Sequence, residues 1–367
     1  MRTRTFVLPA AAAVALAVSG VPAGTAAASA VGRPDRPGFC SPSASLLGFS
    51  DALDKSEVSG TAVSGLSALG LDGRGRAVAL VDNIGTTPAR IVEFSLRRGR
   101  NGLDVAASGA TTLKRPDGTP YNGGDFDGEG LVIERGGRTV LASSESEPSI
   151  RRFRRGDGGQ SAELPVPERF RVAPAGQAAR NQTFESLAAS PDGRTLYGGM
   201  EGSLAPDGPG AVRILSYRGR PGGAYEPAAQ YAYRTDASLG LVELVALGDG
   251  GLLALERGFT AGVGNTVRVY RASTRGARDV TDVGSLRDEP GAALRKEPVV
   301  DLVDCPPSGA TARQPQPNPL LDNVEGMALG GPASGGRRVL YLVSDDNGNA
   351  AQITRVYALS VRLGRMS

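Results

Sequence analysis

The chain has 367 residues with 40% hydrophobic residues, 52 glycines, 25 prolines and a formal net charge of +3. This length can bury one large or two ordinary cores, and the glycine and proline content is typical of a turn-rich β protein rather than a disordered chain. The sequence contains no histidine, which excludes a Ser-His-Asp triad and a histidine-ligated zinc site, and it has no sustained basic stripe with aromatic residues that would indicate a nucleic-acid partner.

The first 30 residues have the pattern of a secretory signal. A basic start is followed by an apolar run over residues 6–18 and by small residues up to Ala30. This pattern predicts residues 1–30 as a cleaved signal peptide and an extracellular, secreted protein. The apolar run is too short for a membrane span, so no span is expected after cleavage, and an uncleaved anchor is the alternative.

Residues 31–45 are rich in Pro, Gly and Ser, and we interpret them as an N-terminal extension over the surface. The chain has two cysteines, Cys40 and Cys305. Disulfides form in oxidising compartments, so we expect the two to pair and to tie the N-terminal segment to a late loop. Two free buried thiols are the alternative.

From residue 46 to residue 367 the chain repeats one unit of about four short strands bounded by Gly, Pro, Asp or Asn. The units begin near residues 63, 128, 184, 241 and 323. Regular repeats of this size predict an all-β propeller of five four-stranded blades. In the fourth unit we expect residues 277–284 to form the outermost strand. A sixth blade stays open if the insertion at residues 286–318 contains one.

The last unit lacks its fourth strand. A predicted strand at residues 46–53 could supply it, so that an N-terminal strand closes the ring and removes two exposed sheet edges.

An acidic residue leads the hairpin of four units, and another acidic residue ends it. Equivalent ends of inner strands meet around a propeller channel, so these residues should converge although they are distant in sequence. The leading acids, expected to act in catalysis together with Arg257, are Glu129, Glu185, Glu243 and Glu325. The trailing residues, expected as metal ligands, are Asp82, Glu145, Glu201, Glu256, Asp345, Asp346 and Asn347. In the first unit Ser64 stands in place of the leading acid.

Many carboxylates near one axis repel one another, and a bound cation offsets that repulsion. Without histidine the ligands are oxygens, which favours Ca²⁺ as the cofactor. Arg257, Arg135 or Arg180 could hold an anionic substrate group. Asp125 or Asp127 could add a metal contact. The alternative is that the acids are solvent-facing turn residues that recur because the blade recurs.

The motifs DFDGEGL (125–131), NQTFESLAASPDGRTLYGGMEG (181–202), VELVALGDGGLLALERGF (242–259) and DNVEGMAL (322–329) follow one another in this order. Together they resemble the phytase-like family, the exported bacterial propellers described as having "esterase-like activity of phytase". The resemblance implies a β-propeller, a phosphoesterase or esterase-like activity, and calcium.

We therefore expect a monomeric metal-dependent phosphoester hydrolase that acts on a small anionic or phosphorylated substrate, with neither a nucleic-acid nor a membrane partner. One alternative is a non-catalytic exported propeller whose acidic ring holds a structural cation and whose surface binds a ligand or protein. Another is a lactonase-like propeller hydrolase, for which Asn83 or Asn347 would complete a single metal site.

Overall fold

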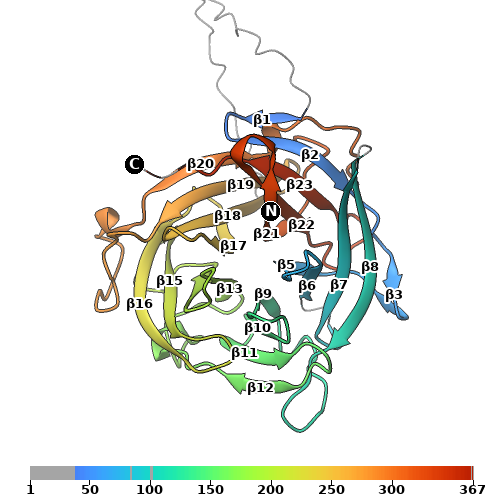
Figure 1. Ribbon diagram of the computed structural model, residues 1–367. Helices are drawn as coiled ribbons and strands as arrows, with labels where there is room; N and C mark the ends of the chain where they lie inside the picture. Colours follow the sequence, from blue (N-terminus) through green and yellow to red (C-terminus); the bar gives the residue numbers. More distant parts are fainter. Residues whose placement is uncertain (1–37, 83–84, 100–101, 365, 367) are drawn as a thin grey trace, which may run out of the picture. The chain divides into compact units, whose positions relative to one another are not determined.

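A computed structural model of the chain describes residues 38–82, 85–99, 102–364 and 366. These residues form five β-sheets of four or five strands around a common centre, as Figure 1 shows. The five-bladed propeller expected from the sequence is confirmed. The predicted signal peptide, residues 31–37 of the predicted extension and Asn83 lie outside the described residues.

Four blades are each built from strands that follow one another along the chain. From the centre outwards, their strands are β5 (Leu66–Leu71), β6 (Ala77–Val81), β7 (Arg90–Gly99) and β8 (Gly102–Thr112); β9 (Gly128–Ile133), β10 (Thr139–Ser144), β11 (Ser149–Arg154) and β12 (Gln160–Glu163); β13 (Phe184–Ala189), β14 (Thr195–Met200), β15 (Ala211–Gly219) and β16 (Tyr225–Arg234); and β17 (Gly240–Ala246), β18 (Gly251–Thr260), β19 (Gly264–Ser273) and β20 (Lys296–Asp301). All neighbouring strands are antiparallel.

The fifth blade combines the two ends of the chain. Its strands are β21 (Val324–Ala333), β22 (Arg337–Ser344), β23 (Val356–Val361), β2 (Ala44–Ser50) and β1 (Phe39–Ser41), in this order from the centre. The antiparallel pairing of β2 with β23 supplies the strand that the last unit lacks. Closure by an N-terminal strand, as predicted, is therefore confirmed.

The predicted disulfide is also confirmed. Cys40 in β1 is bonded to Cys305, which follows the short helix η3. Close by, the Ser41 hydroxyl donates to the carbonyl oxygen of Val299 in β20 at 2.7 Å. The closing segment is thereby attached to the fourth blade as well as to the fifth.

One predicted strand is wrong. Residues 277–284 form a loop, and β20 is the outermost strand of the fourth blade instead. In the loop the Asp279 carboxylate accepts hydrogen bonds from the backbone N–H and the hydroxyl of Thr281, at 2.9 and 2.6 Å. Such local side-chain contacts compete with ladder pairing. In the described part of the chain the insertion therefore supplies a strand of the fourth blade and no sixth blade.

The connections contain short elements only. They are the hairpin β3 (Glu57–Val58) and β4 (Thr61–Ala62) and the 3-10 helices η1 (Glu168–Phe170), η2 (Pro290–Ala292), η3 (Leu302–Asp304) and η4 (Ser334–Gly336). Among the described residues no helix has the length and apolar character needed to cross a membrane.

Each sheet packs against neighbouring sheets on both faces, and this explains its sequence. Every residue of β6 (AVALV) and of β23 (VYALSV) is buried. Strands that are covered on both faces have continuous apolar runs, whereas partly exposed strands alternate. The outermost strand β16 (YEPAAQYAYR) accordingly mixes buried and exposed residues. The apolar layers between blades hold the five inner strands at fixed places around the axis.

Candidate functional site

Every inner strand begins with a β-bulge that sets the direction of one side chain. In β13, for example, Phe184 pairs with Met200 and Ser186 with Gly199, so Glu185 is left over. A bulge re-aims the extra residue and is common next to functional sites. The left-over residues, which we call the inner ring, are Ser67, Glu129, Glu185, Val242 and Glu325.

A second set of side chains lies at the same end of the channel, where the second strand of each blade ends. The backbone N–H of Glu145 donates to the carbonyl oxygen of Asp127 at 2.9 Å, and that of Asp345 donates to Asn323 at 2.8 Å. The corresponding positions, which we call the outer ring, are Asp82, Glu145, Glu201, Arg257 and Asp345. The outer ring thus contains four acids and one arginine.

Two residues that the sequence analysis placed in the rings lie elsewhere. Val242, not Glu243, occupies the bulge of β17, and Arg257, not Glu256, occupies the outer ring. A shift of one residue along a strand turns a side chain to the other side. Glu256 instead accepts hydrogen bonds from the Tyr233 hydroxyl at 2.6 Å, the Asp236 N–H at 2.7 Å and Lys296 Nζ at 2.6 Å.

In the first blade, too, the register differs from the expectation. Ser67, and not Ser64, stands at the bulge position of β5. Ser64 donates a hydrogen bond to Asp346 instead.

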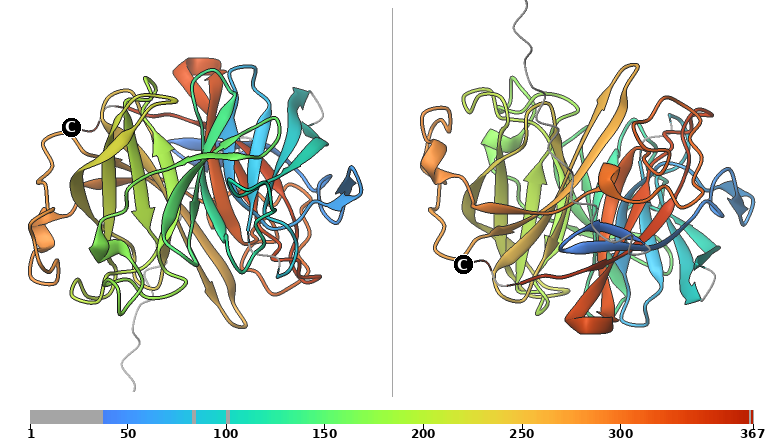
Figure 2. Two further views of the ribbon diagram at one scale, coloured as in Figure 1. Left: turned by 90° about the horizontal axis from the view of Figure 1, so that it is seen from below. Right: turned by 90° about the horizontal axis from the view of Figure 1, so that it is seen from above.

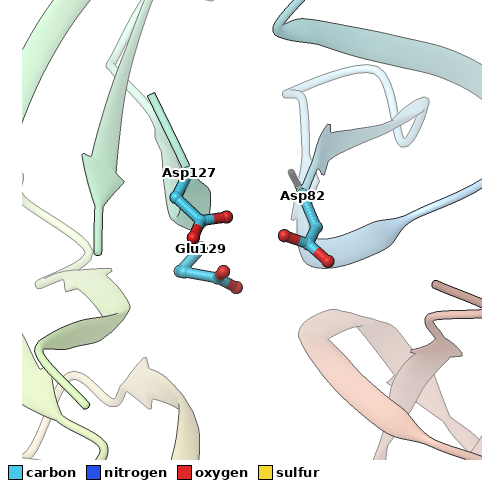
Figure 3. A group of neighbouring side chains, drawn as sticks. All are labelled: Asp82, Asp127 and Glu129. Atoms are coloured by element: carbon cyan, nitrogen blue, oxygen red, sulfur yellow. The ribbon is translucent and has the colours of Figure 1, made fainter. Parts of the chain in front are cut away.

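The carboxylates of the two rings converge. One oxygen each of Asp82, Asp127 and Glu129 lie within 4.8 Å of one another, and the same holds for Glu129, Glu145 and Glu185. Figure 3 shows Asp127 and Glu129 facing Asp82 across a gap between two blades. Glu129 belongs to both groups, so the two clusters form one acidic centre at one end of the inner strands.

Only part of this acidic centre is satisfied by neighbouring groups. Glu325 accepts hydrogen bonds from the Ser67 hydroxyl at 2.8 Å and from Asn323 Nδ2 at 3.0 Å, and it forms an ion pair with Arg257. Asp345 is fully buried, and its Oδ1 accepts the Asn347 N–H at 2.7 Å. Its Oδ2 is buried and has no hydrogen-bond partner among the described residues.

Burial and mutual repulsion raise the pKa values of these acids. Burial first, then Asp127 and the charge of Asp345, raise the pKa of Asp82 to about 10. Burial and the charge of Glu201 raise the pKa of Glu145 to about 8. The pKa values of Glu129, Glu185 and Asp345 are raised well above the ordinary range, in each case chiefly by burial and then by neighbouring carboxylates.

A hard cation fits this chemistry. The ligand atoms are carboxylate oxygens, the type that Ca²⁺ and Mg²⁺ prefer. A positive charge would stabilise the ionised forms of Asp82 and Glu145 that burial disfavours. Asp345, whose Oδ2 has no hydrogen-bond partner among the described residues, acts electrostatically on Asp82 but lies outside both groups of three carboxylates.

The remaining predicted residues lie around this centre rather than in it. Asp346 is buried and binds Lys55, Ser64 and the Gly65 N–H. Burial alone would raise the pKa of Asp346, but the hydrogen bonds from Lys55, Ser64 and the Gly65 N–H outweigh burial and lower it. Asn347 is exposed, and its side-chain amide contacts Gln352.

The other charged candidates lie on loops. Arg135 is exposed on the turn between β9 and β10, at the far end of the hairpin from the acidic centre, and Arg180 is exposed in the loop before β13. Asp125 pairs with Arg115. The sequence analysis did not identify Ser67 and Asn323, and it treated Asp127 only as a possible additional metal contact. The position of Asp127 two residues before Glu129 indicated that both side chains could lie on the same side of the strand.

A pocket of about 530 Å³ opens beside the outer ring, between the third and fourth blades. Glu201 lies on its wall and packs so closely on Gly240 that a Cβ there would be 3.0 Å from Glu201 Oε1. The polar residues that line it are Gln182, Ser203, Thr235, Ser238 and Arg287. The Thr235 hydroxyl is buried without a hydrogen-bond partner in the described part of the chain.

The hairpin of β18 and β19 rises on the same face as the acidic centre, since Arg257 lies near the end of β18. In side view this hairpin and the turn between β21 and β22 project from opposite faces (Figure 2). Phe259 and Val263 near the hairpin tip are 53% and 57% exposed. Two apolar side chains are thus exposed on the hairpin that projects from this face.

Comparisons with known proteins give one family match and several distant structural similarities. A family model described as "Phytase-like: Esterase-like activity of phytase" matches residues 61–348. No curated protein matched the chain. Among solved structures, Kuenenia stuttgartiensis hydrazine synthase is 12% identical, with 79% of this chain and 81% of that chain covered and a TM-score of 0.38. The periplasmic gluconolactonase of Pseudomonas aeruginosa is 14% identical, with 84% of this chain and 88% of that chain covered and a TM-score of 0.35.

Similarities at this level carry no information about the site. The family match is of a different kind, because it spans the chain from β4 to just beyond β22 and includes every residue of both rings. The chain therefore belongs to the phytase-like family.

Proposed function

We propose that this protein is an exported, metal-dependent phosphoester hydrolase whose reaction takes place at the acidic centre. The observation that carries the proposal is the convergence of buried carboxylates from several blades, with one buried oxygen of Asp345 left without a partner among the described residues. Asp82, Asp127, Glu129 and Glu185 would hold the cation, with Ca²⁺ as the expected ion. A bound divalent cation polarises a phosphoryl oxygen and lowers the pKa of a bound water.

Arg257 would bind the substrate anion. It is the one cationic side chain of the two rings, and it lies beside Glu325, Glu185 and Glu201. Burial lowers its pKa, but these carboxylates outweigh burial and raise it, so the guanidinium stays charged. A guanidinium held in place by a neighbouring carboxylate can present its other N–H groups to a phosphate in a fixed direction.

Glu145 would move the proton. A general acid or base works best when its pKa lies near the working pH. Burial and the nearby Glu201 raise the pKa of Glu145 to about 8, and the Thr183 N–H holds its Oε1 at 2.9 Å. This pKa describes the metal-free site, and a bound cation would lower it. The hydrogen bond from Thr183, which fixes the orientation of the carboxylate, is therefore the observation that supports the role of Glu145.

The pocket beside Glu201 would take the leaving group. Its hydroxyl and amide side chains suit a hydroxylated alcohol, and the Thr235 hydroxyl lacks a partner among the described residues.

The test is a panel of phosphomonoesters and short-chain esters, assayed with Ca²⁺ and with a chelator. We expect Ca²⁺-dependent release of phosphate, and a strong loss of activity in Glu129→Gln and Glu185→Gln. Glu226→Gln, an exposed change on the outer strand β16, is the matched control and should keep full activity. Absence of hydrolysis throughout the panel, together with a melting temperature unaffected by chelation, would refute the proposal.

The ion pair between Arg257 and Glu325 favours one second candidate, a non-catalytic propeller with a structural cation. In that case Arg257 would serve to balance the acids and not to bind substrate. Chelation would then lower the melting temperature, and no member of the panel would be hydrolysed.

A further inference from the structure

Glu243 stands one residue beyond the bulge of β17. The equivalent positions of the five inner strands lie at one level along the propeller axis. The same position in the other inner strands holds a small residue, namely Ala68, Gly130, Ser186 and Gly326. Two of these positions leave no space for a side chain. A Cβ on Gly130 would lie 2.5 Å from the backbone nitrogen of Leu187, and one on Gly326 would lie 3.0 Å from that of Leu69. Glu243 is thus the one long side chain at this level, and it is 1% exposed.

The innermost strand of each blade is a sheet edge, so some of its backbone N–H groups face the channel without a ladder partner. One residue beyond the level of Glu243, these edges supply the N–H groups of Leu69, Leu131, Leu187, Leu244 and Met327. Four of these five groups face the Glu243 carboxylate. The Leu244 N–H donates to its Oε1 at 2.9 Å. Burial, the largest effect, raises the pKa of Glu243 well above its ordinary range, and the N–H groups of Leu244, Leu69, Leu187 and Met327 act against burial by stabilising the ionised form.

We propose that the axis of the propeller at this level is a backbone anion-binding site, and that the chain fills it with its own Glu243 carboxylate. Converging N–H groups form an anion-binding concavity without any cationic side chain. The donors come from the first, third, fourth and fifth blades, so one carboxylate links four inner strands.

The position of Glu243 also divides the channel. On one side lie the rings that form the acidic centre. On the other side is a smaller cavity of about 190 Å³ whose wall is largely apolar and includes Leu71, Ile133 and Val245. Glu243 lies at the boundary, on the wall of that smaller cavity. A substrate therefore reaches the acidic centre from one face only. This inference does not rest on the proposed hydrolase function, because it concerns the backbone groups beneath the rings.

The test is chemical rescue. Glu243→Ala removes the anion but keeps the N–H groups, so it leaves an axial cavity that fits a small monovalent anion such as formate. Leu253→Ala is the matched control, because Leu253 is an equally buried residue of the same blade whose truncation opens a cavity without removing a carboxylate. Melting temperatures are measured for both variants and for the native chain in sodium formate, and in sodium benzoate, whose anion is too large, at the same ionic strength.

We expect Glu243→Ala to melt at a lower temperature than the native chain and to regain several degrees in formate but not in benzoate. A ligand that binds only the folded state raises stability in this way. The native chain and Leu253→Ala should show no formate-specific shift. The same gain from formate in both variants, or no gain in Glu243→Ala, overturns the proposal.

A second variant decides the question if Glu243→Ala does not fold. Glu243→Gln has the same shape but presents an amide with one acceptor oxygen to the N–H groups. We expect a lowered melting temperature that formate does not restore, because the space is occupied. A Glu243→Gln chain as stable as the native one would show that the site has no need of an anion and would overturn the proposal.

Discussion

At the scale of single residues, Arg257 is the most informative position of the site. It replaces an acid in an otherwise acidic outer ring and contacts Glu325 in the inner ring. We predict that Arg257→Ala tightens Ca²⁺ binding, because a positive charge next to the ligands is removed. The same change should raise KM for a phosphomonoester by about 10- to 100-fold, since a charged hydrogen bond contributes about 1.5–3 kcal/mol.

Calorimetric titration with Ca²⁺ and steady-state kinetics measure the two effects separately. Arg257→Lys keeps the charge and should recover part of the lost KM while leaving Ca²⁺ affinity near that of the native chain. If Arg257→Ala lowers the melting temperature but leaves KM unchanged, the arginine acts in the structure alone.

Glu129 tests the proposed cation binding at the same site, since its carboxylate belongs to both acidic clusters. We predict that Glu129→Gln weakens Ca²⁺ binding at least tenfold, which corresponds to about 1.4 kcal/mol. The change removes one charged ligand and keeps the volume of the side chain. Ca²⁺ affinity measured by calorimetry checks this, and Glu134→Gln, in an ion pair with Arg152 at the opposite end of the same hairpin, is the control that should leave affinity unchanged. Equal affinity in Glu129→Gln and the native chain would exclude Glu129 as a ligand.

At the scale of strands, the pairing register determines which site residues could be predicted from the sequence. The leading acids Glu129, Glu185 and Glu325 could be found from the sequence because an apolar run follows each of them. The structure shows that each stands at a bulge. Glu243 could not be told from them by pattern, because a bulge moves by one residue without changing local composition. The unequal spacing was a signal, since Glu243 and Glu256 are closer in sequence than Glu129 and Glu145 are.

The number of blades could be predicted because each blade needs its own set of apolar strands. The outermost strand of the fourth blade could not, because residues 277–284 and β20 have similar composition and only tertiary pairing distinguishes them. The pairing of β2 with β23 could be predicted from the missing strand, since an unclosed ring leaves two sheet edges exposed.

The disulfide gives a prediction for the closing strands. Cys40 lies in β1, next to β2, so the bond to Cys305 ties the N-terminal end of the closure to the connection between the fourth and fifth blades. We predict that Cys40→Ser with Cys305→Ser lowers the free energy of unfolding by about 2–5 kcal/mol. Urea unfolding measures this, and a reductant should lower the stability of the native chain by a similar amount and leave the double variant unaffected. A reductant effect of equal size on both proteins would show that the bond is not its target.

At the scale of the whole molecule, the acidic centre makes the free energy of unfolding depend on pH. A bound cation should reverse the direction of that dependence. In the folded chain the pKa of Glu145 is raised to about 8, chiefly by burial, and that of Asp82 to about 10. Their ordinary values in an unfolded chain are near 4. The folded state therefore binds more protons than the unfolded state above about pH 4, and the stability of the metal-free chain falls as the pH rises from about 5 to about 8.

A bound cation should reverse this trend, because it stabilises the ionised carboxylates and protons compete with it. We predict that, in the presence of a chelator, the melting temperature is several degrees higher at pH 5 than at pH 8. Added Ca²⁺ should raise the melting temperature at pH 8 and have little effect at pH 5. Asp346 does not contribute to the difference: burial alone would raise its pKa, but the hydrogen bonds from Lys55, Ser64 and the Gly65 N–H lower it, so this carboxylate stays ionised throughout the range.

Thermal unfolding at the two pH values, with chelator and with excess Ca²⁺, provides the four measurements. Asp345→Asn with Glu145→Gln removes two of the raised groups and should flatten the pH dependence of the metal-free chain and reduce the effect of Ca²⁺. Glu256→Gln leaves the acidic centre intact and should preserve both effects at a lower overall melting temperature. A metal-free chain that is more stable at pH 8 than at pH 5 would mean that these buried carboxylates are ionised without a cation. Their mutual repulsion would then no longer support a metal centre.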